Sequence, residues 1–210
     1  YQDSHNAGVA VLQLAAPRGH RLVMQPHHAT SDGRLQVFGV QWGGHHAALV
    51  NTYWPNAAAA QSAFLDDVLT PALGNLPPGQ LLLTGDFNHV PDSALDRTRL
   101  PGGELKNSRR RQEHALAARL LAVLDACGHA CVDSFRTLHA TSPGFSHIRH
   151  SNAARLDRWY VAAGVQGYVQ SCKVLPTPHQ DHLPVLLAVT PREASPRRRT
   201  QARAFRARCD

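Results

Sequence analysis

The stretch LLLTGDFN, residues 81–88, places the strongest constraint on how this chain can fold. Its three leucines form an apolar run without alternation, and such a strand is buried on both faces of its sheet. Layers of structure must therefore lie on either side. Gly85 lets the backbone turn, and Asp86 and Asn88 follow at the carboxyl end of the strand. Open α/β sheets place ligand-binding groups at that end, so we expect a functional rim there, although an ordinary Asx turn is the alternative.

Short apolar runs predict more strands than helices. Strands are predicted over residues 8–14, 35–41, 46–53, 80–84, 155–162 and 183–189, with 169–175 as a weaker candidate. Apolar side chains at helical spacing predict helices over residues 58–73 and 112–127. Consecutive strands at 35–41 and 47–53 suggest a hairpin, which favours a mixed α/β (α+β) arrangement over a doubly wound parallel sheet. The polar residues 91–111 predict a long functional loop.

Positive charge is concentrated at the end of the chain. The 210 residues carry a formal net charge of +7. Residues 191–210 contain seven arginines against Glu193 and Asp210, so this tail contributes +5 of that charge. We therefore predict one domain over residues 1–190 and a basic, disordered tail or linker over 191–210. Such a tail binds polyanions or serves only for solubility.

The sequence also suggests a cellular setting. It contains no apolar run of membrane-spanning length and no charged-then-apolar leader, so an intracellular, nuclear location without membrane attachment is expected. Tyr1 stands where a complete protein would have methionine, which predicts a piece of a longer protein. The motif CGHAC, residues 127–131, could bind zinc, but no second Cys/His pair at finger spacing accompanies it. Free thiols in a reducing compartment are the preferred reading.

Two other predicted strands also end in groups suited to phosphate chemistry. Tyr53 ends one of them and Asn56 follows closely, either as rim groups or as an interface aromatic and an ordinary helix start. Asp157 stands within the strand 155–162, where burial of an unpaired carboxylate would be costly.

His182, which opens the last predicted strand, offers Asp157 a partner. A carboxylate beside a histidine orients the imidazole and stabilises its cation, as in a general-base dyad. The alternative is that Asp157 pairs at the surface with Arg155 or Arg158.

The order of these motifs resembles the endonuclease/exonuclease/phosphatase family, which has the DNase I-like fold. The matching motifs are the strand-end Tyr53, GDFN at 85–88, RLD at 155–157 and DH at 181–182. The stretches GDFNHVPDSALDR, CVDSFRTLHATSPGFSH and RLDRWYVA further resemble the endonuclease domains of non-LTR (LINE-type) retrotransposons. The resemblance covers nearly all of residues 8–189. It implies a four-layer DNase I-like β-sandwich flanked by helices, here lacking its first strands.

The resemblance also implies roles for individual residues. Asp86 would handle the proton of the attacking water or of the leaving group, and His182, oriented by Asp157, would contact or protonate a phosphate oxygen. Asn88 would hold the scissile phosphate. Tyr53 would hydrogen-bond it. Asn56 and Ser146 would also contact the substrate phosphate or the DNA, with Ser146 at a position often held by threonine. The basic side chains of Arg109, Arg110 and Arg111 predict non-specific contacts with DNA.

The principal metal ligand of the family is a Glu in a strand that ends in Gln-Glu. No such strand precedes residue 8, and Asp3 is too close to Gly8 in sequence to replace the Glu, so Asp181 is left near the metal. We therefore expect a Mg²⁺- or Mn²⁺-dependent DNA endonuclease domain with impaired metal binding and weak or no activity. No obligate protein partner is predicted, and a fusion to a reverse transcriptase domain in the parent protein is left open.

Two other functions fit the same motifs. One is a catalytically dead nucleic-acid-binding remnant. The weaker one is a phosphatase or phosphodiesterase of the same fold that acts on small phosphoesters.

Overall fold

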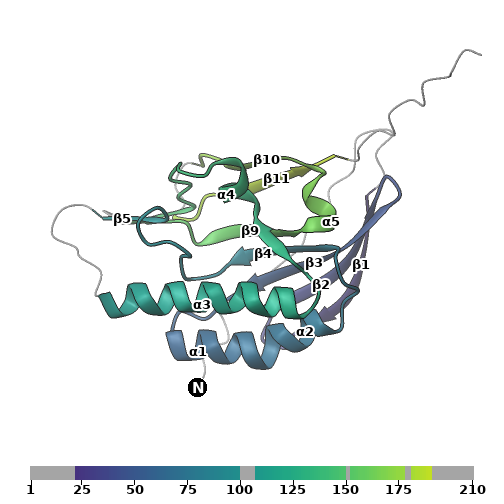
Figure 1. The fold of residues 1–210 in the computed structure, drawn as a ribbon, viewed down its shortest axis with the longest axis horizontal. Helices are drawn as coiled ribbons and strands as arrows, with labels where there is room; N and C mark the ends of the chain where they lie inside the picture. The colour runs from purple at the N-terminus through teal and green to yellow at the C-terminus, as the bar shows by residue number, and fades with distance from the viewer. Residues whose placement is uncertain (1–21, 100–106, 150–151, 178–180, 191–210) are drawn as a thin grey trace, which may run out of the picture.

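A six-stranded sheet runs through the middle of the protein (Figure 1). The computed structural model describes residues 22–99, 107–149, 152–177 and 181–190. In spatial order the strands are β1 (Leu22–Ala29), β2 (Leu35–Trp42), β3 (His45–Tyr53), β4 (Leu81–Asp86), β9 (Asp157–Ala162) and β6 (Cys131–Asp133). β3 and β4 are parallel, while the other neighbouring strands are antiparallel. The parallel pair brings two carboxyl ends to one edge of the sheet.

Helices cover one face of this sheet (Figure 1). They are α1 (Ala58–Ala63), the π-helical segment η1 (Phe64–Leu69), α2 (Thr70–Gly74) and α3 (Asn107–Ala126). Leu81 and Leu83 of β4 are fully buried in the same apolar cluster as Leu65 and Leu120 from the helices. Successive side chains of a strand point to opposite faces, so these two leucines fill the helical side.

A smaller layer packs on the opposite face. It consists of β10 (Val169–Val174), β11 (Val185–Val189) and the short helices α4 (Ser134–Leu138) and α5 (Ala163–Gln166). Leu82 and Val161 lie in a second apolar cluster with Val165, Leu187 and Val189. β4 is thus buried on both sides, as its leucine run predicts. The mixed α/β sandwich is confirmed.

Three very short strands form a third sheet. They are β5 (Arg97–Arg99), β8 (Asn152–Ala154) and β7 (His147–Arg149), in that spatial order. Backbone hydrogen bonds from Arg155 to Asp96 and from Ser146 to Ala154 connect the segments around it. Strands of three residues carry no readable periodicity, so the sequence does not predict them.

Several predicted boundaries were wrong. The loop over 91–111 contains β5 and the first residues of α3, which begins at Asn107 instead of residue 112. β4 continues to Asp86, and β9 begins at Asp157, so both carboxylates lie at strand ends. The helix over 58–73 widens into the π-helical η1, where Thr70 Oγ1 donates to the Leu65 carbonyl and Pro71 offers no N–H.

β1 was not predicted at all. Among the described residues it is the outermost strand of the sheet, with mostly exposed side chains and a register shift near Pro26, so burial imposes no apolar pattern on it. The predicted strand 8–14 and the predicted tail 191–210 lie outside the described residues. Among the residues described, no group containing Cys127 or Cys131 is arranged to hold a metal. None of the described helices has the length and apolar character needed to cross a membrane.

Candidate active site

Three strand ends meet at one edge of the central sheet. In register, Asp86 at the end of β4 stands opposite Tyr53 at the end of β3 and opposite Asp157 at the start of β9. Residues directly opposite each other point their side chains to the same face. The sheet register therefore places a phenol and two carboxylates in one row.

The backbone after Asp86 is held in a tight turn. Gly85 has φ +138°, and a Cβ at this position would overlap the backbone carbonyl of Thr52 on β3. The backbone of Asn88 adopts a left-handed conformation with φ 51°, and its N–H donates to Asp86 Oδ1 at 2.9 Å. The turn therefore fixes one oxygen of the Asp86 carboxylate. The Asx turn considered as the alternative is present, and it forms part of the site.

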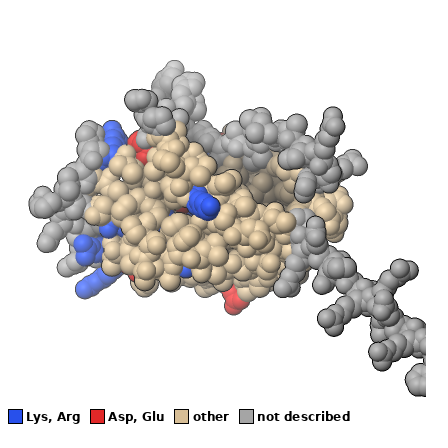
Figure 2. All heavy atoms as spheres, turned by 90° about the horizontal axis from the view of Figure 1, so that it is seen from above, with Lys and Arg blue, Asp and Glu red and all other residues tan. Residues whose placement is uncertain are grey.

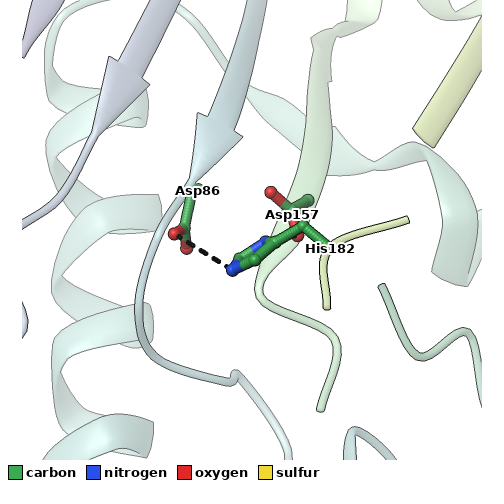
Figure 3. Close-up of side chains that lie close together, drawn as sticks. All are labelled: Asp86, Asp157 and His182. Carbon is green, nitrogen blue, oxygen red and sulfur yellow. Dashed lines mark hydrogen bonds and ion pairs between the residues drawn. The ribbon is translucent and has the colours of Figure 1, made fainter. Parts of the chain in front are cut away.

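His182 connects the two carboxylates (Figure 3). Its Nδ1 lies 2.9 Å from Asp157 Oδ2, within hydrogen-bond distance. Its Nε2 lies 4.0 Å from Asp86 Oδ2. Both carboxylates are more buried than the imidazole, whose side chain is 39% exposed. One imidazole nitrogen is thus oriented by Asp157, and the other faces Asp86 at the open side of the site.

This crowding shifts the protonation of the site. Burial, followed by the nearby charge of Asp157, raises the pKa of Asp86 to about 6, against the lowering effect of the Asn88 N–H and of the charges of His182 and Arg158. The hydrogen bond that His182 donates to Asp157 raises the pKa of His182. With a pKa of about 6, Asp86 is close to its titration range near neutral pH, and the raised pKa of His182 favours its protonated form, which suits the pair to proton transfer.

The same three side chains could hold a divalent cation. One ligand atom from each of Asp86, Asp157 and His182 lies within 4.8 Å of the others, and no further group of this kind occurs in the described part of the chain. Mg²⁺ usually binds one or two carboxylates and keeps several waters, so this donor set fits it. Asp157 is already bonded to His182, which leaves Asp86 as the principal protein ligand.

The predicted metal ligand Asp181 lies beside this group. It is exposed, and its carbonyl accepts a hydrogen bond from the Ile148 N–H. Its negative charge acts on His182, although its carboxylate does not join the three-residue group. Its role at a metal therefore stays a prediction. Asp3 lies outside the described residues.

The predicted phosphate-binding side chains occupy different places. Asn88 Nδ2 donates to the Trp54 carbonyl at 2.8 Å, which uses one of its two amide hydrogens. The ring of Tyr53 lies under the Arg34 guanidinium, with 5.1 Å between Cζ and the ring centroid. Asn56 is exposed and lines the neighbouring grooves.

Ser146 supports the site from behind. It is fully buried, and its hydroxyl accepts a hydrogen bond from the Asp157 N–H at 2.8 Å. A direct contact with DNA, as the sequence predicted, does not suit a side chain in that position. Its hydroxyl instead holds the backbone that carries Asp157.

Neither arginine beside Asp157 pairs with it. Arg155 and Arg158 are each 1% exposed. Arg155 pairs with Asp96 at 2.7 Å and with Asp133 at 2.7 Å. Arg158 bonds to the carbonyl of His89. The surface pairing considered for Asp157 is therefore wrong, and His182 is its partner.

A groove of about 400 Å³ opens next to the row formed by Tyr53, Asp86 and Asp157. Its lining includes Asn56, Asn88, His147, Arg97, Arg109 and Arg149. Figure 2 shows lysine and arginine side chains gathered at the end of the molecule where β5 and the start of α3 lie. Arg109 is half exposed and bonds to Glu113 at 3.1 Å, while Arg110 and Arg111 are exposed. Part of the positive charge expected to contact DNA is thus offset by Glu113.

His147 is a further residue of the site that the sequence pattern does not predict. Its ring packs edge-on against His182, with 4.7 Å between centroids, and the two residues form an isolated β-bridge. Burial and then the charge of His182 lower its pKa, which favours a neutral imidazole beside a cationic one. Its position next to Ser146 in GFSH was visible in the sequence, but nothing in the pattern indicated a contact with His182.

The family follows from a comparison with known sequences. The sequence profile of the Endonuclease/Exonuclease/phosphatase family matches residues 5–182. The chain belongs to this family. It is a family of nuclease-type hydrolases that typically use a divalent metal ion. A direct comparison with curated proteins finds no significant match.

Solved structures agree on the fold. An AP endonuclease from Leishmania major superposes with a TM-score of 0.58 at 20% identity, covering 76% of this chain and 55% of that one. A 3'-5' exonuclease from Neisseria meningitidis superposes with a TM-score of 0.57 at 17% identity, covering 81% of this chain and 80% of that one. The endonuclease domain of TRAS1, a telomere-specific non-LTR retrotransposon, gives 0.52 at 15% identity, over 84% and 82%. The chain thus spans about half of the Leishmania enzyme.

Proposed function

We propose that this protein hydrolyses phosphodiester bonds in DNA with the help of a divalent metal ion, Mg²⁺ or Mn²⁺. The observation that supports this most is the placement of His182 between Asp157, at 2.9 Å, and Asp86, at 4.0 Å. With one carboxylate on each side of the imidazole, the site contains an oriented proton donor, His182, and a proton acceptor, Asp86.

His182 is the cationic group of the reaction. Asp157 orients the ring through Nδ1 and stabilises its protonated form, so Nε2 presents an N–H towards the open side. A phosphate oxygen placed there gains a charge-assisted hydrogen bond as negative charge develops on it. Asn88 and Tyr53, on the neighbouring strand ends, complete the contacts with the phosphate.

Asp86 is the group that exchanges a proton. Its Oδ1 is held by the Asn88 N–H, while Oδ2 faces the site. A carboxylate held in this way orients the attacking water or returns a proton to the leaving oxygen. A bound divalent cation would add charge stabilisation at the phosphate, and Asp86 and Asp157 are the residues that would hold it.

DNA is the proposed substrate because the groove beside the site is basic. Arg97, Arg109 and Arg149 line it, and the single carboxylate of Glu113, which pairs with the first two, leaves a net positive charge that suits the phosphates of DNA. A 3' phosphatase from Neisseria, solved with a product DNA hairpin, has the same fold with a TM-score of 0.56 at 16% identity. The motif resemblance described above favours a retrotransposon-type endonuclease, and the TRAS1 domain is among the solved structures that share the fold.

The test is a nicking assay on supercoiled plasmid at high protein concentration, with and without Mg²⁺ or Mn²⁺. Metal-dependent nicking that is lost in both Asp86→Asn and His182→Ala supports the proposal. DNA binding without nicking at any metal concentration would indicate the nucleic-acid-binding remnant. Release of inorganic phosphate from small phosphoesters, without nicking, would indicate a phosphatase.

A further inference from the structure

Arg158 is a buried cation without a carboxylate partner. Its side chain is 1% exposed, and among the described residues no carboxylate oxygen lies within ion-pair distance of its guanidinium. The equally buried Arg155, three residues earlier, is paired with Asp96 and Asp133. A buried charge normally needs such a partner. The role of Arg158 must therefore be sought in the groups that its guanidinium contacts in place of a carboxylate.

Within its own segment of the chain, Arg158 Nη1 donates to the Arg155 carbonyl at 3.0 Å, and Cζ lies 5.8 Å from the Tyr160 ring centroid. Its other contacts belong to the turn that follows Asp86. Nη1 donates to the His89 carbonyl at 2.6 Å, and Nη2 lies 3.4 Å from His89 Nε2. The guanidinium stacks over the Phe87 ring, with 4.5 Å from Cζ to the ring centroid. Cation–π stacking and a charge-assisted bond to a carbonyl partly replace the missing carboxylate.

His89 is arranged to receive this cation. It is fully buried, and its Nδ1 lies 2.7 Å from the Phe87 carbonyl, so Nδ1 carries the hydrogen. Nε2 then presents its lone pair to Arg158. Burial and the charge of Arg158 lower the pKa of His89 to about 3, which agrees with a neutral ring. The imidazole thus links the turn to Arg158 through both of its nitrogens.

The backbone places this contact on both sides of Asp86. In the β4–β9 register, Arg158 stands opposite Gly85, one residue before Asp86, and Asp157 stands opposite Asp86 itself. The Arg158 side chain reaches His89, three residues after Asp86. Arg158 therefore contacts the chain on both sides of Asp86, through strand pairing at Gly85 and through its side chain at His89.

We propose that Arg158, together with neutral His89, is a positioning residue for the active site. It holds the Phe87–His89 turn against β9 and thereby fixes the Asp86 carboxylate relative to Asp157. Its unpaired positive charge also offsets the repulsion between these two carboxylates. The proposal rests on the proposed function only in taking Asp86 as a reacting group.

The first test compares Arg158→Met with Arg158→Lys by NMR. The amide hydrogen of Asn88 reports the bond to Asp86 Oδ1, and its resonance should move upfield in Arg158→Met. Lysine keeps the charge but cannot make both contacts with His89. The Asn88 amide resonance of Arg158→Lys should therefore lie between those of Arg158→Met and the wild type. Arg119→Met is the control, because Arg119 is exposed and pairs with Asp66 on the helical side. It should leave the Asn88 signal unchanged.

The second readout separates chemistry from binding. Arg158→Met should lower the single-turnover nicking rate about 10²-fold, while the Kd for the DNA stays within about twofold. An unchanged Asn88 resonance, or a rate loss that only follows the fraction of unfolded protein, would overturn the proposal. If the wild type shows no nicking with any metal ion, the proposed function fails, and the Asn88 resonance still decides the role of Arg158.

The wild type provides a test if Arg158→Met does not fold. Nitrogen-15 spectra should show His89 as the neutral Nδ1–H tautomer from pH 5 to 8, with slowly exchanging Arg158 Nη hydrogens. An Nε2–H tautomer, a cationic His89 or fast exchange at Arg158 would overturn the proposal.

Discussion

Nδ1 of His182 lies 2.9 Å from Oδ2 of Asp157, although the two residues are 25 positions apart in the chain. The Ser146 hydroxyl accepts a hydrogen bond from the Asp157 N–H and so fixes the backbone that carries the carboxylate. The ring of His182 packs against the ring of His147. The orientation of His182 thus depends on three separate segments. This dependence makes the pair the first place to probe the site.

Asp157→Asn should lower the nicking rate about 10²–10⁴-fold, because the amide neither stabilises the imidazolium nor selects its tautomer. The measurement is the initial rate of plasmid nicking, with melting curves to show that the variant is folded. Asp125→Asn, an exposed change on α3, is the matched control and should retain the wild-type rate. An Asp157→Asn rate within about threefold of the wild type would contradict this role.

The raised pKa of Asp86 predicts a pH-dependent stability. Between pH 4 and about 6 the folded state binds more protons at Asp86 than the unfolded state, so the free energy of unfolding falls as pH rises through this window. Asp86→Asn removes the effect. The variant should match the wild type at pH 4 and exceed it at pH 7 by on the order of 2 kcal/mol.

Urea unfolding at pH 4, 5, 6 and 7 measures this difference. The raised pKa of His182 also stabilises the folded protein at low pH. This contribution is lost at higher pH than that of Asp86, as pH rises through the folded pKa of His182. The comparison below pH 6 therefore isolates Asp86. A variant that is less stable than the wild type at pH 7 would show that the folded protein favours the ionised carboxylate.

Mg²⁺ should bind this 210-residue chain weakly and support only slow nicking. Mg²⁺ loses its waters reluctantly, and Asp157 is engaged by His182, which leaves Asp86 as the main ligand. At a concentration equal to a millimolar Kd, the ion should raise the Tm by about 1 °C in the wild type and not in Asp86→Asn. Robust Mg²⁺-dependent nicking that Asp86→Ala and His182→Ala both abolish would contradict this prediction. Asp181→Asn then tests the neighbouring carboxylate.

Gly85→Ala should disrupt the site and the sheet together. A Cβ there would overlap the Thr52 backbone on β3, and φ +138° is unfavourable for any side chain. We expect a loss of at least about 3 kcal/mol in the free energy of unfolding. Gly74→Ala is the control, because a Cβ at Gly74 meets no atom within 4 Å. Its stability should be unchanged or slightly higher.

Binding to DNA should depend steeply on salt through the start of α3. Replacing Arg109, Arg110 and Arg111 by glutamine should weaken binding and reduce the slope of log K against log salt by about two to three. Deleting residues 191–210 should reduce it further if the tail contacts DNA. Fluorescence anisotropy with a labelled duplex at several salt concentrations measures both slopes. Equal slopes for all three proteins would place the DNA elsewhere.

The local pattern of the sequence was sufficient for the central strands and for the row formed by Tyr53, Asp86 and Asp157. The unbroken leucines of β4 require burial on both faces, and glycine at 85 permits the turn that places Asp86 at the rim. Tyr53 and Asp157 stand at strand ends for the same reason, since strands of a sheet share their edges. Strand burial and turn chemistry act within a few residues, so they are readable from the sequence.

The buried charges were decided only by the tertiary structure. Arg155 finds Asp96 at a separation of 59 residues, and Arg158 finds His89 at 69. Nothing near either arginine in sequence shows that it is buried. The same holds for His147 against His182, and for β1, whose mostly exposed side chains carry no apolar pattern. The cost of burying a charge depends on partners that only the fold brings within reach, and a single sequence does not specify that distance.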